Sequence, residues 1–202
     1  MLHAAPLPGT FPTLTAVLFG LSGCLVDFGA RTRHQDAGGE TIHTTPGALD
    51  ILNALRSQGI PCAWLDELAA DTCTHLAQSL PEGIVAAPNQ HPWPTPHACW
   101  AALMALNVER LDGCVLVSGE PRLLQSGLNA GLWTIGLASC GSLCGLAPSQ
   151  WQALSQQERE QKRGKATLQL FNLGVHSVID HLGDLPTCLA DISLRRLKGE
   201  KP

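Results

Sequence analysis

The sequence lacks the short motifs with which many enzymes hold a phosphate group or activate a nucleophile. It contains no GxxxxGKS/T or GxGxxG loop and no GxSxG turn. It has no CxxC pair of the kind that structural zinc sites use. It has no apolar run long enough to span a bilayer, and its net charge is -4. We therefore expect that the chain does not span a membrane and that it binds neither nucleic acid nor a membrane surface.

The first residues do not resemble a secretory signal, because no basic segment is followed by an apolar block. They are rich in proline. We expect a disordered arm over residues 1–14 and one core domain over residues 15–202. The eight cysteines are scattered along the chain. Without a secretory signal, we expect them to be reduced and the protein to be cytoplasmic.

Short apolar runs alternate with helical segments along the chain, a pattern typical of βαβ units. This pattern predicts an α/β fold, a three-layer α/β/α sandwich around a mainly parallel sheet. The expected strands are 16–19, 60–65, 84–86, 114–117, 133–137 and 177–179. The expected helices are 46–58, 68–79, 97–106, 121–129, 148–173 with a break near Gly164, and 185–197.

The stretch 15–29 is the best candidate for a site. The apolar run Ala16–Phe19 predicts a buried strand, which Gly20 ends, and the turn Ser22-Gly23-Cys24 follows. In open α/β sheets, ligands bind at the carboxyl ends of strands, so a site is expected where this strand ends.

This stretch resembles the signature of the haloacid dehalogenase (HAD) superfamily, in the branch of phosphonoacetaldehyde hydrolase (phosphonatase). The branch has FDxAGTxVDFG after a hydrophobic strand, and residues 19–29 read FGLSGCLVDFG. Residues 127–136, GLNAGLWTIG, are very similar to its NAGMWTVG stretch. Weaker similarities extend the resemblance over nearly the whole chain after residue 14. The resemblance implies a HAD-like Rossmannoid core.

In that family, an aspartate at the end of the first strand is the nucleophile and a Mg2+ ligand. Gly20 stands at that position here, and Ser22 stands two residues later, where phosphatases carry an acid and phosphonatases an alanine. The threonine that holds the phosphoryl group aligns with Asp66, whose charge would repel a phosphonate. The cation of the third motif aligns with Trp93.

The remaining catalytic groups of the family are missing as well. Ser118-Gly119 occupies the start of the motif that supplies metal-binding carboxylates, and only Glu120 offers an acid nearby. The family's imine lysine belongs to a helical cap inserted after VDFG. Only eighteen residues separate Asp27 from Pro46, and none is lysine. The resemblance therefore implies that the cap domain is missing, and no cofactor is expected in place of the family's Mg2+.

We interpret the sequence as a non-catalytic phosphonoacetaldehyde hydrolase-like protein, a pseudoenzyme that binds a partner or a small ligand and has a link to phosphonate metabolism. The alternative is a HAD-family hydrolase of a phosphonate or phosphate ester with a rebuilt site. Cys24, Ser118 or Glu120 would then replace lost groups, and Asp66 would pair with Ser22 or Cys24. For Asp66 itself, we favour the simpler role of an acid at a helix N-terminus, together with its neighbour Glu67.

A third interpretation is a structural subunit. The proline-rich segment 88–96 is expected to be a loop, because its prolines lack backbone donors. Trp93 and Trp100 flank a loop in this region that a cap would cover. Exposed apolar patches often mark interfaces, so this interpretation predicts a protein partner or a homo-oligomer. The simpler explanation is that the tryptophans fill the former pocket.

Overall fold

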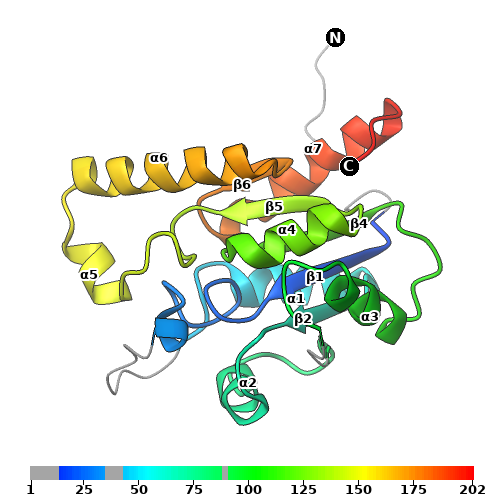
Figure 1. The fold of residues 1–202 in the computed structure, drawn as a ribbon, viewed down its shortest axis with the longest axis horizontal. Helices are drawn as coiled ribbons and strands as arrows, with labels where there is room; N and C mark the ends of the chain where they lie inside the picture. Colours follow the sequence, from blue (N-terminus) through cyan, green and yellow to red (C-terminus); the bar gives the residue numbers. More distant parts are fainter. Residues whose placement is uncertain (1–13, 35–42, 88–90) are drawn as a thin grey trace.

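The computed structural model describes residues 14–34, 43–87 and 91–202, and its centre is a six-stranded sheet (Figure 1). The strand order is β3-β2-β1-β4-β5-β6, and every neighbouring pair is parallel. The predicted α/β class with a parallel sheet is confirmed. The strands are β1 (Ala16–Gly20), β2 (Cys62–Leu65), β3 (Val85–Ala86), β4 (Cys114–Ser118), β5 (Trp133–Leu137) and β6 (Ser177–Ile179).

Helices cover both faces of the sheet, as the three-layer prediction requires (Figure 1). The α-helices are α1 (Ala48–Ser57), α2 (Ala70–Ala77), α3 (His97–Ala105), α4 (Pro121–Asn129), α5 (Pro148–Ala153), α6 (Gln156–Leu173) and α7 (Leu185–Leu197). Two short 3-10 helices are η1 (Arg31–His34) and η2 (Leu182–Asp184).

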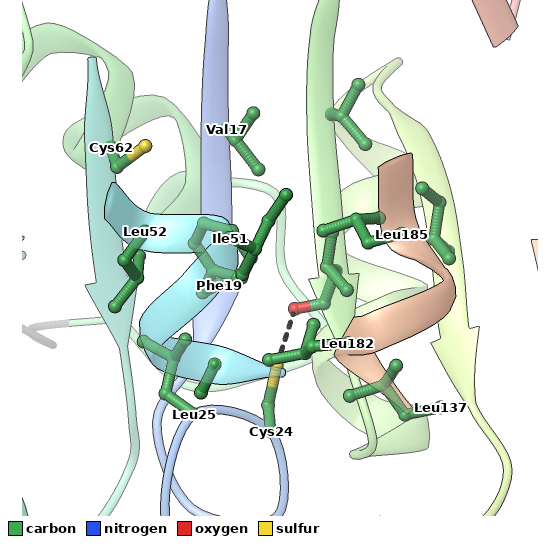
Figure 2. Close-up of a cluster of buried hydrophobic side chains, with 14 of the residues drawn as sticks. Val17, Phe19, Cys24, Leu25, Ile51, Leu52, Cys62, Leu137, Leu182 and Leu185 are labelled. Carbon is green, nitrogen blue, oxygen red and sulfur yellow. Dashed lines mark hydrogen bonds between the residues drawn. The ribbon is translucent and has the colours of Figure 1, made fainter. Parts of the chain in front are cut away.

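The alternation of side chains along β1 places one apolar cluster on each face. Leu18 packs with side chains of α3 and α4. Val17 and Phe19 point to the opposite face, where Figure 2 shows them beside Ile51 of α1 and near Leu185 of α7. All three β1 side chains are fully buried, so the strand that leads to the expected site lies in the middle of the core.

Most predicted boundaries agree with the structure within two residues. The bounds 121–129, 133–137, 177–179 and 185–197 are confirmed as predicted. The connection after β1 contains η1. Most of the expected disordered arm, residues 1–13, lies outside the described residues, as do residues 35–42 and 88–90.

The predicted break near Gly164 is wrong, because the helical segment 148–173 divides at Leu154 and Ser155. Both residues are extended, with ψ angles of 144° and 160°. Ser155 Oγ accepts a hydrogen bond from Glu158 N at 3.3 Å, and Ser155 N donates to Glu158 Oε2 at 2.8 Å. This capping box starts a new helix. Gly164 continues α6, since one glycine in a helix interior costs only about 1 kcal/mol.

The described residues contain no helical cap domain between β1 and α1. Among its described residues, that connection holds only η1 and two isolated bridges, which join Val26 to Ser22 and to Thr44. No helix in the described part of the chain is both long enough and apolar enough to cross a bilayer.

Alanine substitutions at two helical glycines should change the free energy of unfolding in opposite directions. A Cβ at Gly164 would meet no atom within 4 Å, so Gly164→Ala should raise the free energy of unfolding by about 0.5–1 kcal/mol. A Cβ at Gly127 in α4 would overlap Leu116 and lie 2.9 Å from Thr134 Cγ2. Gly127→Ala should therefore lower the free energy of unfolding by about 1–3 kcal/mol. Urea unfolding followed by circular dichroism measures both, and a loss of stability in Gly164→Ala would contradict a continuous α6.

Candidate functional site

The predicted positions converge where β1, β2 and β4 end. Gly20 ends β1, Asp66 follows β2, and Ser118 ends β4. Ser22 N donates to Asp66 Oδ2 at 2.9 Å, so the loops after β1 and β2 are directly joined. We call this region the strand-end site, and its members are Gly20, Ser22, Asp66, Trp93, Ser118, Gly119 and Glu120.

An ion pair between Asp66 and Arg33 occupies the centre of the strand-end site. Arg33 Nη2 donates to Asp66 Oδ1 at 2.6 Å. The Asp66 side chain is fully buried and that of Arg33 is 15% exposed. Leu68 N also donates to Asp66 Oδ1, at 3.0 Å. Burial raises the pKa of the Asp66 carboxyl, while Arg33 and the N–H groups of Ser22 and Leu68 act in the opposite direction.

The expectation that Asp66 and Glu67 are simple helix N-terminal acids is wrong. The helix α2 begins only at Ala70, and both carboxylates make tertiary ion pairs instead. Glu67 Oε2 accepts from Arg122 Nη1 at 2.7 Å, and Glu67 Oε1 accepts from Trp93 N at 2.6 Å. Arg122 also donates to the Trp93 carbonyl oxygen.

Trp93 fills the position where the family resemblance places a cation. Its side chain is buried, and the Arg33 guanidinium carbon lies 5.0 Å from the centre of its ring. A cation over an aromatic face is attracted by the ring quadrupole. Trp100, the other tryptophan expected near this loop, is 40% exposed, and its Nε1 donates to the Ala130 carbonyl oxygen at 3.3 Å.

Asp27, the acid of the VDFG sequence, sets the position of Arg33. Its carboxylate accepts from the backbone N–H groups of Arg31 at 3.2 Å and Thr32 at 3.1 Å, which start η1. Ser22 Oγ donates to the same carboxylate at 2.7 Å. The sequence alone did not indicate Arg33, because nothing in its local pattern marks the partner of an acid 33 residues away.

Glycines at the strand-end site allow backbone segments to approach too closely for any side chain. A Cβ at Gly119 would lie closer than 3.0 Å to backbone atoms of Gly141 and Gly23, a distance that real Cβ atoms essentially never show. A Cβ at Gly20 would lie 2.8 Å from Ser118 Oγ. Ser118 Oγ accepts from Glu120 N at 3.0 Å, so this hydroxyl is already engaged.

Cys24 points away from the strand-end site and into the core. Its Sγ donates to the Val117 carbonyl oxygen at 3.4 Å, among the apolar side chains around Leu25 and Leu182 (Figure 2). The side chain is fully buried, and burial raises the pKa of the thiol well above its usual value. A buried thiol with a raised pKa is a poor nucleophile.

The residues present do not fit a magnesium ion. Within the part of the chain that the structure describes, no three His, Cys, Asp or Glu side chains are grouped so that they could hold a metal. Gly20 and Gly119 carry no ligand atoms in their side chains. Asp66 is neutralised by Arg33, and Glu120 caps α4 by accepting from Arg122 N at 3.2 Å. Carboxylate oxygens that could meet at one point are therefore lacking here.

Comparison with known proteins identifies similar chains, although no family model matches the sequence. Phosphonoacetaldehyde hydrolase of Salmonella agona (strain SL483) is 30% identical over 172 residues, which cover 77% of this chain and 61% of the relative. The chain thus spans about three fifths of the length of the curated relatives it matches.

Solved structures show the same fold. One chain is 65% identical with a TM-score of 0.91, and the match covers 94% of this chain and 100% of the other. A phosphonoacetaldehyde hydrolase-like protein from Oleispira antarctica has a TM-score of 0.82 at 22% identity, with both chains covered completely. The fold is therefore HAD-like.

The Arg33–Asp66 pair can be tested by removing one partner and then both. Arg33→Met leaves a buried carboxylate without its cation and should lower the free energy of unfolding by about 3–5 kcal/mol. The double variant Arg33→Met/Asp66→Asn removes that charge and should be more stable than the single variant. Urea unfolding at neutral pH measures both proteins.

The loss of stability in Arg33→Met should depend on pH. In Arg33→Met, Asp66 has a folded-state pKa above its unfolded value, so the folded state binds the extra proton. The variant should therefore gain stability as pH falls through that folded-state pKa, and lose it as pH rises. Arg110→Met, which changes an exposed arginine, is the control. A stability of Arg33→Met equal to that of this control would contradict a structural role of the pair.

Proposed function

This chain belongs to the haloacid dehalogenase superfamily and is similar to its phosphonoacetaldehyde hydrolases, and from this premise we propose that it is a non-catalytic member that acts by binding. The scaffold of the family is kept, but the strand-end site carries side chains and backbone that serve structure. The bound molecule is a protein partner or a small ligand, and the similarity to phosphonoacetaldehyde hydrolases favours a link to phosphonate metabolism.

The close approach of Gly119 to Gly141 and Gly23 carries this proposal. The family resemblance places a metal-binding carboxylate at Gly119, and a side chain of any kind would collide there with backbone atoms. Backbone cannot retreat as the end of a flexible side chain can. The close approach leaves no room for a side chain at this position, and it supports our proposal that this protein works without the metal ion of the family.

The ion pair at the centre of the strand-end site also supports a non-catalytic role. The Arg33 guanidinium is bound to Asp66 and stacks on Trp93, so a phosphoryl group would have to displace a buried ion pair. Displacement would leave Asp66 as an uncompensated buried charge, which is strongly unfavourable.

The alternative, a hydrolase with a rebuilt site, needs an accessible nucleophile. Ser22 is 1% exposed, while Cys24 and Ser118 are fully buried. Ser22 Oγ donates to Asp27, and it is the Ser22 backbone N–H that contacts Asp66. The acid and nucleophile that this alternative pairs are therefore not arranged for proton transfer.

The proposal predicts no turnover of phosphonate or phosphate esters. With Mg2+ present, phosphate release from phosphonoacetaldehyde and from 4-nitrophenyl phosphate should stay at the level of buffer, while a phosphonoacetaldehyde hydrolase measured in parallel releases phosphate. Gly20→Asp should also be inactive, because a restored carboxylate has no metal ligands beside it.

Mg2+-dependent release by the unmodified protein would refute the non-catalytic proposal. The variant Asp66→Asn then tests the alternative. Loss of that release in a variant that still unfolds cooperatively would assign the chemistry to a rebuilt site around Asp66.

A further inference from the structure

A second cavity lies beside the strand-end site, where β5 and β6 end. Its volume is about 840 Å³, which lies within the range of small-molecule sites. Ser139 follows β5 and Asp180 follows β6, and both line it. The helix α5 and the start of α6 extend beyond the ends of these strands and form another wall (Figure 1). We call it the β5–β6 cavity.

One side of the β5–β6 cavity is aromatic and apolar. The rings of Phe28 and Trp151 lie 6.2 Å apart between centroids at an angle of 52°, and both line the space. Pro46 and Pro148 add rigid apolar surface. A flat apolar group is the complement of such a wall.

The polar side of the cavity carries an arginine that forms no ion pair with a described residue. Arg159 in α6 is partly buried, and its guanidinium makes no hydrogen bond or ion pair with any described residue. Arg163, one helical turn later, is bound to Asp180 at 2.7 Å. The carboxylate of Asp27 accepts three hydrogen bonds within its own loop.

The third acid of the lining, Glu160, is exposed and accepts from Gln156 Nε2 at 2.9 Å. The carboxylates of the cavity are thus engaged, while the guanidinium of Arg159 retains its donors. A guanidinium presents its donors in a planar fork that matches a carboxylate or phosphate group. We propose that the β5–β6 cavity binds a small aromatic anion, with its charged group on Arg159 and its ring against Phe28 and Trp151. This inference rests on the proposed binding role and names the class of ligand.

Calorimetric titration of the full chain tests the assignment with four probes. Phenyl phosphate and benzoate carry both a ring and a charge, benzyl alcohol carries only the ring, and inorganic phosphate carries only the charge. The two aromatic anions should bind saturably, and the two partial probes should bind at least about tenfold more weakly. If neither aromatic anion binds saturably, the proposal is wrong.

Two variants test whether the aromatic anions bind in the β5–β6 cavity. Arg159→Met should weaken the aromatic anions at least about tenfold, while Arg110→Met, which changes an exposed arginine outside the cavity, should leave their affinity unchanged. Equal affinity in Arg159→Met and the unmodified protein would overturn the assignment, even if binding is observed. Phosphate released from phenyl phosphate in the same samples would refute the non-catalytic proposal instead, so the two failures are distinguishable.

Discussion

The buried ion pair between Arg33 and Asp66 is the constraint on which the carboxyl edge of the sheet depends. Asp66 also binds the backbone of Ser22 and Leu68, so one carboxylate joins the loops after β1 and β2 to the short helix η1. Stacking of Arg33 on Trp93 adds the proline-rich loop to the same assembly. Removal of Arg33 would leave the Asp66 carboxylate buried without its cation, so the pair makes this arrangement cooperative.

This arrangement supports the proposal that the scaffold of the family is kept here without the chemistry of the family. Asp27, the acid of VDFG, orients η1 and thereby places Arg33. Because Gly119 and Gly20 have no side chains, the segments around them can approach each other closely. The space that remains open lies on the other side of the same edge, between Phe28 and the helices α5 and α6.

The sequence was sufficient to predict the sheet, the helices of the core and the edge of the sheet where Gly20, Asp66 and Ser118 meet, because apolar periodicity and the family signature are local patterns. It did not reveal the partner of Asp66, since Arg33 lies in a polar loop and the pairing is made only by the tertiary fold. The division of the helical segment 148–173 was also misplaced. Gly164 predicts a break within this segment, whereas the capping box of Ser155 and Glu158 decides the boundary.

The central claim is that the strand-end site is closed to a phosphoryl group and its metal ion. Amide 1H–15N spectra of the full chain, titrated with inorganic phosphate in the presence of Mg2+, test this claim most directly. The account predicts no saturable shifts for the amides of Ser22, Ser118 and Glu120. Saturable shifts at these amides would contradict it, because they would show that phosphate enters the site that Arg33, Trp93 and the glycine contacts close.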